Sequence, residues 1–191
     1  MKKIIAILLA VLTALSLTAC ASRADGGQSS QTPEIPDALT LLNGVWDTYA
    51  EDEKFTAAGG DYNEENMTDG APGKVGLDDA DSVSYLLSVP VDVVSKFDDA
   101  ASLFHMLNGN TFTCGAYRLT DAAELESTAA SIKSYVMSKQ WMCGFPDKLV
   151  IASVGSYIVE VFGAEDLVNT FRDKLTACYE GVTIITDEPI M

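Results

Sequence analysis

The residues best suited to chemistry in this chain are carboxylates that gather in short acidic runs. A hard cation such as Ca²⁺ takes about six to eight oxygen ligands, which acidic loops can supply. The candidate metal ligands are Asp61, Glu64, Glu65, Asp78, Asp79 and Asp81. Reading from Asp61, an EF-hand would need glycine where Asn66 stands and glutamate where Pro72 stands. We therefore favour a solvated acidic surface, with calcium binding and carboxylate-based hydrolysis as alternatives.

The sequence gives little support for chemistry by cysteine or histidine. Cys114 alternates along a strand with apolar residues and Cys178 falls on the apolar stripe of a helix, so both are predicted to be core residues. Cys143 lacks the second cysteine of a C-x-x-C redox pair. In an exported protein, any two of these three cysteines could form one disulfide, and the sequence does not say which two. His105 is the only histidine and is predicted to be structural, because no Gly-x-Ser-x-Gly elbow accompanies it. We predict no catalytic residue and no cofactor.

The start of the chain has the parts of an export signal. Two lysines precede an apolar run over residues 4–17, which is shorter than the roughly 18 residues that span a membrane. The run ends in Leu17, Thr18, Ala19 and Cys20. These four residues resemble the lipobox of bacterial lipoproteins, whose pattern is leucine, a small residue, alanine or glycine, and cysteine.

The lipobox resemblance implies where the protein lies in the cell. In that family a diacylglycerol is attached to the cysteine sulfur and the signal, here residues 1–19, is removed. Cys20 would then be the first mature residue and would carry two or more acyl chains, which make a lasting anchor. We expect a protein held by lipid on the outer face of the cytoplasmic membrane. An ordinary secretory signal that happens to end in cysteine is the alternative.

The charge of the chain excludes one class of partner. Loss of residues 1–19 removes two lysines and no acid, so the formal net charge changes from −16 to −18. Nucleic acid and anionic headgroups repel so acidic a surface, and we predict no nucleic-acid partner. Residues 20–36 are rich in Gly, Ser and Gln and are predicted to be a flexible linker, and residues 37–191 a single domain.

Apolar spacing predicts helices in the first part of the domain. Apolar residues at intervals of three and four predict a helix over 37–55, with Asp37 as its cap. The glycine-rich segment 59–76 is predicted to be a loop. A shorter helix is predicted over 78–87, and a helical turn over 90–97.

Strands dominate the second part. The Asn-Gly pair in residues 108–110 predicts a tight hairpin turn with positive φ angles, between strands 102–107 and 111–119. The later predicted elements are a helix over 120–140, strands over 148–154 and 156–162, a helix over 165–179 and a strand over 182–186. This order is that of a ferredoxin-like, split βαβ core. We therefore predict an α+β fold, an antiparallel sheet with helices on one face, extended by N-terminal helices and a hairpin strand.

Three segments carry a second resemblance. They are "FPDKLVIAS", "VGSYIVEVF" and "AEDLVNTF". With the aromatic-rich strand and long helix before them, they look like an uncharacterised family of lipoproteins from Gram-positive anaerobes, known only as a domain of unknown function. The likeness covers about residues 82–179. It implies a cell-surface setting and assigns no catalytic residue.

These observations favour a binding module over an enzyme. The lipobox, the linker and the lack of an assembled catalytic set lead us to expect a non-enzymatic binding or accessory protein of the cell envelope. Its expected partners are the membrane, through the lipid on Cys20, and an envelope protein. An envelope hydrolase that uses unrecognised carboxylates is the rival hypothesis.

Overall fold

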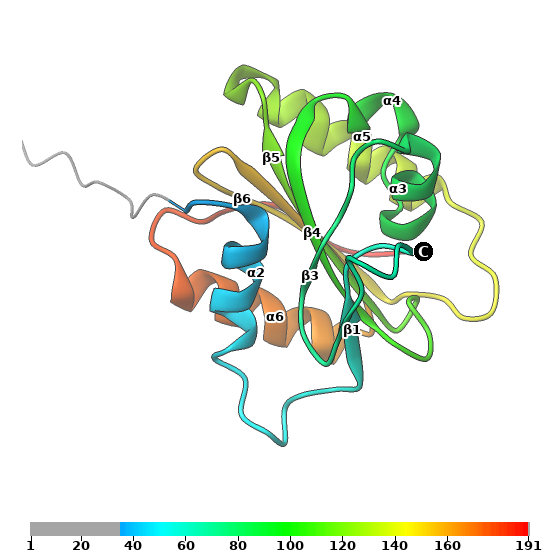
Figure 1. Cartoon of the computed structure of the whole chain (residues 1–191), viewed down its shortest axis with the longest axis vertical. Helices are drawn as coiled ribbons and strands as arrows, with labels where there is room; N and C mark the ends of the chain where they lie inside the picture. Colours follow the sequence, from blue (N-terminus) through cyan, green and yellow to red (C-terminus); the bar gives the residue numbers. More distant parts are fainter. Residues whose placement is uncertain (1–34, 191) are drawn as a thin grey trace, which may run out of the picture. The chain divides into compact units, whose positions relative to one another are not determined.

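The computed structural model describes residues 35–190, which form an α+β unit on an eight-stranded antiparallel sheet (Figure 1). The strands are β1 (Ala57–Gly59), β2 (Thr68–Asp69), β3 (Gly73–Lys74), β4 (Phe97–His105), β5 (Phe112–Leu119), β6 (Lys148–Val154), β7 (Tyr157–Gly163) and β8 (Thr183–Pro189). The helices are α2 (Ala38–Trp46), α3 (Ala80–Leu87), α4 (Val91–Val94), α5 (Leu125–Ser138) and α6 (Glu165–Cys178), with a 3₁₀ turn at Ala122–Glu124. Within the described residues, no helix is long and apolar enough to cross a membrane.

The sheet is built around two hairpins. Its strand order is β2-β1-β4-β5-β7-β6-β8, and β3 also pairs with β4. β4 and β5 form the first predicted hairpin, and β6 and β7 form the second. The first turn differs from the prediction, because neither Asn108 nor Gly109 has a positive φ. Residues 106–111 form a longer loop instead, in which the Asn108 side chain accepts a hydrogen bond from the backbone N–H of Asn110 at 3.0 Å.

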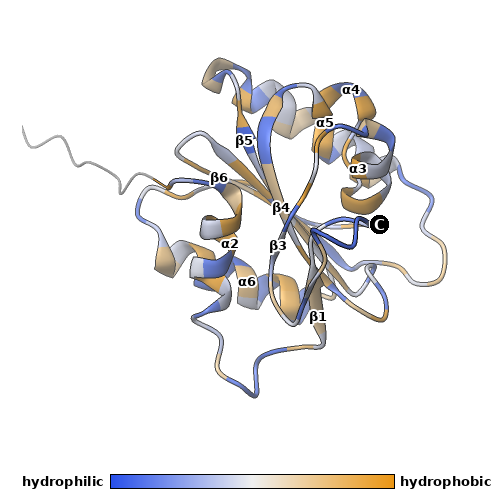
Figure 2. Ribbon diagram, viewed as in Figure 1, coloured by the Kyte–Doolittle hydropathy of each residue, from blue (hydrophilic) through white to orange (hydrophobic). Residues whose placement is uncertain are grey.

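Helices cover both faces of the sheet, so the central strands are buried twice (Figure 1). One core contains residues of α2 and α6, and the other contains residues of α3, α4 and α5. β6 separates them, since Val150 and Ala152 belong to the first core and Leu149 and Ile151 to the second. All seven residues of β7 are buried. A strand enclosed on both sides is apolar along most of its length, which Figure 2 shows for the centre of the sheet.

The prediction of helices on one face is wrong, and the handedness of the connections explains why. β5, α5 and β6 form a split βαβ unit with β7 between the two strands, and β7, α6 and β8 form another around β6. The connection from β5 to β6 and the connection from β7 to β8 both move across the sheet toward the β8 edge. However, β5 and β7 are antiparallel, so the two connections start from strands that run in opposite directions. Right-handed crossovers therefore place α5 and α6 on opposite faces.

The ferredoxin-like order is also not the one found. In that order the last strand lies beside the first strand of the core, which here is β5. The free edge of β5 is taken by β4, and β8 pairs with β6 instead. The extra hairpin strand thus redirects the end of the chain to the opposite edge.

The first helix is shorter than predicted. Asp37 caps it as expected, since its carboxylate accepts a hydrogen bond from the backbone N–H of Thr40 at 2.6 Å. α2 ends at Trp46, although the apolar spacing continues beyond it. The acidic residues 51–53 disfavour extension, because they would lie at the negative end of the helix dipole.

The predicted loop over 59–76 contains the short strands β2 and β3, and glycines allow them to form. The backbones of Gly59 and Gly73 pass so close that a Cβ on Gly73 would lie 2.5 Å from the carbonyl carbon of Gly59. Ser102 fixes the same crossing, since its hydroxyl donates to the Gly60 carbonyl at 2.6 Å and accepts from the Gly60 N–H at 2.8 Å.

Replacing Gly73 by alanine should lower the free energy of unfolding by about 1–3 kcal/mol, because the new methyl group must displace backbone. Gly109→Ala is the matched control, since its Cβ would meet only the Thr113 hydroxyl, at 3.3 Å. Urea unfolding of both variants measures the difference. Equal losses in the two variants would contradict this explanation.

Candidate functional site

The predicted acidic ligands are only partly brought together. Asp61, Asp78 and Asp79 line one surface hollow of about 430 Å³, and Glu64 and Glu65 are exposed. The Asp61 carboxylate already accepts three hydrogen bonds. Their donors are the Asn63 N–H, the Asn66 side-chain amide and the Gly76 N–H, at 2.7–2.9 Å. Asp61 therefore organises its own loop.

Asp79 has a structural role as well. Its carboxylate caps α3 by accepting from the backbone N–H of Asp81 and from both the N–H and the hydroxyl of Ser82, at 2.8–3.2 Å. The hydrogen bonds from Ser82 lower the pKa of Asp79. Among residues 35–190, no group of three or more His, Cys, Asp or Glu side chains could hold a metal ion.

The cysteines and the histidine lie apart. Cys114 is buried in the sheet as predicted, and burial raises the pKa of its thiol. The prediction for Cys178 is wrong, because it is exposed at the end of α6, one turn beyond the last buried residue, Leu175. Cys143 is also exposed, and all three thiols are free. His105 is structural, since it stacks on Phe55 and accepts a hydrogen bond from a backbone N–H through Nδ1.

A site that the sequence did not indicate lies at one end of the sheet, where two loops expose large apolar side chains. Met106 and Leu107 belong to the β4–β5 loop and are 46% and 80% exposed. Met142 and Phe145 belong to the segment after α5, and each is 79% exposed. We call these four residues the apolar tip. Exposed apolar groups that gather in one place are typical of interaction surfaces.

Two asparagines hold the loops of the apolar tip together. The side-chain amide of Asn108 donates to the Cys143 carbonyl at 3.2 Å. The amide of Asn110 donates to the carbonyls of Met142 and Gly144 at 2.8 and 3.0 Å. Cys143 has φ +62°, which turns the second loop back toward the first. The two loops, which are far apart in the sequence, run side by side and are positioned in advance of any contact (Figure 1).

The tip carries no charge in an otherwise acidic protein. Residues 106–111 and 140–146 contain no Asp, Glu, Lys or Arg, although the chain has a net charge of −16. Interface cores between proteins are depleted of charge and enriched in methionine and aromatic residues. The composition of the tip is thus that of an interface core.

A pocket adjoins the tip and shares Phe145 with it. We call it the Lys139 pocket; its volume is about 530 Å³ and its lining is Lys139, Gln140, Trp141, Phe145, Pro146 and Ile190. Lys139 Nζ donates to the Ser88 hydroxyl at 2.6 Å and lies 4.8 Å from the centroid of the Trp141 ring. Partial burial lowers the pKa of Lys139, against an opposing effect of Glu160.

A fully buried carboxyl lies in the core on the α5 face. Glu160 of β7 accepts a hydrogen bond from Tyr117 through Oε2 at 3.2 Å, and its Oε1 has no partner among the described residues. Gly115 makes room for this pair, because a Cβ there would lie 2.0 Å from the Tyr117 hydroxyl. Burial raises the pKa of Glu160 well above its ordinary value, which favours the protonated carboxyl. The sequence signal for this site is a single acid inside the apolar run of residues 157–162.

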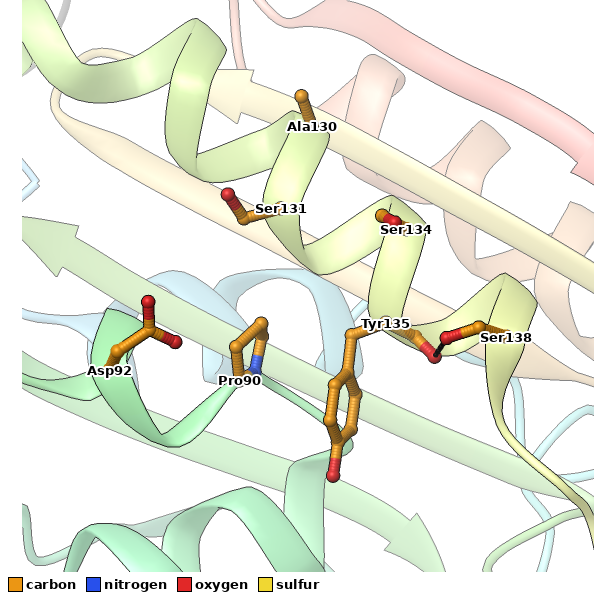
Figure 3. Close-up of a pocket in the computed structure, with 7 residues that line it drawn as sticks. All are labelled: Pro90, Asp92, Ala130, Ser131, Ser134, Tyr135 and Ser138. Carbon is orange, nitrogen blue, oxygen red and sulfur yellow. Dashed lines mark hydrogen bonds between the residues drawn. The ribbon is translucent and has the colours of Figure 1, made fainter.

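A second hollow lies between α5 and the start of α4, where Pro90 and Asp92 face α5 (Figure 3). It exists because α5 carries small side chains there, Ala130, Ser131 and Ser134 among them. The hydroxyls of Ser131 and Ser138 donate to carbonyls of their own helix, at 2.9 and 3.1 Å. These two hydroxyls are therefore already engaged by the backbone of α5.

Comparison with known proteins gives no family for this chain: no family model, no curated protein and no solved structure matches it. The geometry described above therefore carries the functional argument.

The buried Glu160 should make stability depend on pH. Its folded-state pKa lies above the ordinary value of 4.5, so between these two values the folded state holds a proton that the unfolded state has released. The free energy of unfolding then falls as the pH rises through this range and stays low above it. Glu160→Gln, which keeps an acceptor for Tyr117, should remove up to about 1.4 kcal/mol of this loss per pH unit.

Urea unfolding from pH 4.5 upward measures the effect as the difference between Glu160→Gln and the unchanged chain. The exposed Glu126→Gln is the control for the loss of one carboxyl from the surface. A pH-independent difference for Glu160→Gln would contradict the assignment of a protonated, buried carboxyl.

Proposed function

We propose that this protein is an extracytoplasmic lipoprotein whose folded domain binds a protein partner of the cell envelope through the apolar tip. The lipobox at residues 17–20 and the polar linker support the anchor; both lie outside the described residues, apart from residues 35 and 36. The proposal includes the likeness of residues 82–179 to uncharacterised Gram-positive lipoproteins, which brings no activity with it.

The single observation that carries the binding role is the pre-organised apolar tip. Its four side chains are exposed, although their burial would be favourable by about 25 cal/mol per Å². The asparagine hydrogen bonds keep the two loops in one arrangement, so little ordering entropy is lost when a partner binds. Exposed apolar side chains on loops that are held in one arrangement are expected of a surface that binds a partner, and not of one that contacts only water.

The start of the domain is fixed at the other end of the sheet. Tyr157 donates to the Ile35 carbonyl and Arg118 to the Pro36 carbonyl, each at 3.1 Å. The backbone N–H of Ala38 donates to the Asp99 carboxylate at 2.6 Å. β4 runs nine residues from this end to the tip, a length of about 30 Å at roughly 3.3 Å per residue.

This polarity favours a protein partner over the membrane itself. The chain enters the domain near residue 35, at the end of the sheet opposite the apolar tip, so a flexible tether to a lipid on Cys20 would leave the tip free to meet a partner. The net negative charge of the chain would also disfavour contact with anionic headgroups. The partner that fits is a protein with an apolar depression and a neutral or basic rim.

Cys20→Ala should release the protein from the membrane into the medium, because it removes the sulfur that carries the lipid. The released chain should keep the thermal unfolding midpoint of the folded domain. Fractionation of native cells, followed by detection of a C-terminal tag, measures the release. Retention of the variant in the membrane fraction would count against the anchor.

The tip is tested by Leu107→Asn combined with Phe145→Asn. Both side chains are largely exposed, so the fold should persist while binding falls by about tenfold or more, as expected for the loss of central apolar contacts. The measurement is cross-linking on intact cells and quantification of the co-purified protein, with unrelated lipoproteins as background.

Tyr85→Asn is the matched control, because Tyr85 is 75% exposed but lies on α3, outside the tip. It should recover as much partner as the unchanged chain. Equal recovery by the double variant, or no partner above background for the unchanged chain, would overturn the proposed function.

A further inference from the structure

Lys139 differs from the other cations of the described domain. Among residues 35–190, only Lys74 and Lys139 have no carboxylate within 4.0 Å, and Lys74 is exposed to water. Lys139 is partly buried, so its charge is poorly solvated. A partly buried ammonium without a counter-ion is unfavourable, and it favours an anion that can reach it. Seven of the nine Lys and Arg side chains of residues 35–190 are paired with a carboxylate, so the lack of a paired acid of these residues at Lys139 distinguishes the pocket.

The groups around the ammonium leave donor capacity free. An ammonium has three N–H donors, and the Ser88 hydroxyl accepts one of them. The Trp141 ring lies against the ammonium and attracts it, but a ring face does not neutralise its charge. The buried Glu160 is not within salt-bridge distance of Lys139, and no other carboxylate among residues 35–190 is.

The rest of the pocket is mostly apolar. Trp141, Phe145, Pro146 and Ile190 line it beside Gln140. Its volume of about 530 Å³ lies within the range of about 300–1,000 Å³ that is usual for small-molecule sites. One cationic group in an apolar enclosure matches a ligand with one anionic end and an apolar body.

We infer that the Lys139 pocket binds a carboxylate carried on an apolar body, such as a medium-chain or aromatic acid. The carboxylate lies against Lys139 Nζ, and the apolar body packs on Phe145, Pro146 and Ile190. This binding activity goes beyond the proposed contact of the tip with a protein. It stands whether or not the tip has a partner, because it rests on the cation and its enclosure.

The test is a fluorescence titration of the chain from residue 20 onward, with Cys20→Ala to avoid lipid. Octanoate and 3-phenylpropionate are the probes, and octanamide is the neutral analogue. Binding should change the emission of Trp141, while the deeply buried Trp46 in the other core gives a constant background. Octanoate should bind about tenfold more tightly than octanamide, because only the acid forms a charge-assisted hydrogen bond.

Lys139→Met, which keeps the length and the apolar stem, should weaken octanoate binding by about tenfold and abolish the preference over octanamide. Lys74→Met removes an exposed, unpaired cation elsewhere and should change neither. The preference of the unchanged chain for the acid tests the inference even if Lys139→Met fails to fold. Equal binding of acid and amide, or no binding of either acid, would overturn it.

Two further measurements identify the source of the carboxylate and distinguish the pocket proposal from the proposal for the apolar tip. A short peptide that ends in phenylalanine binds more tightly than 3-phenylpropionate if the natural ligand is a chain end, and more weakly if it is a free acid. Leu107→Asn should leave acid binding unchanged, because Leu107 does not line the pocket. Failure of the tip to capture a partner is thereby distinguishable from failure of the pocket.

Discussion

Burial of the central strands on both faces is the constraint on which the rest of the structure depends. β7 has no exposed residue, and its neighbours β5 and β6 are almost as enclosed. Their backbone groups are satisfied by pairing within the sheet, and their side chains are divided between two cores. The faces of the sheet are therefore committed to packing, and surfaces for recognition are left to its ends and to the outer sides of the helices.

The same constraint governs the one acid placed in the middle of the sheet. Glu160 has apolar residues around it, one tyrosine hydroxyl as a donor and a glycine that makes the space. Ionisation there costs more than it does in water, which raises the pKa of the carboxyl.

The two ends of the sheet have different character. At one end, Tyr157, Arg118 and Asp99 fix the incoming chain by hydrogen bonds. At the other, Asn108 and Asn110 lock together two loops whose apolar side chains face the solvent. A protein tethered by its N-terminus would gain reach from this arrangement, because the length of β4 separates the tether from the tip.

Local patterns in the sequence predicted local structure well and long-range arrangement poorly. The Asp37 cap, the two hairpins and the helices over α5 and α6 follow from spacing and turn residues. The placement of α6 depends on whether another strand already occupies the edge of β5, and no local pattern reports that.

The site residues show the same division between local and long-range information. In the sequence, Met142 and Phe145 cannot be distinguished from buried apolar residues. Only the folded structure shows that both side chains are exposed. Cys178 continues an apolar stripe in the sequence, yet the core ends one turn before it. The candidate acids can be recognised in the sequence. The hydrogen bonds that Asp61 and Asp79 accept from the rest of the chain cannot.

The orientation of the tip can be measured with the two exposed thiols, Cys143 beside the tip and Cys178 at the end of α6. Two labelled forms of the lipidated protein would be compared on vesicles that contain a headgroup quencher. One carries a dye at Cys178 and the substitution Cys143→Gly, and the other carries the dye at Cys143 and the substitution Cys178→Ser. Glycine suits the positive φ at position 143. Quenching should be stronger at Cys178 than at Cys143. Stronger quenching at Cys143 would mean that the apolar tip faces the membrane, and would contradict a tip that binds a protein partner.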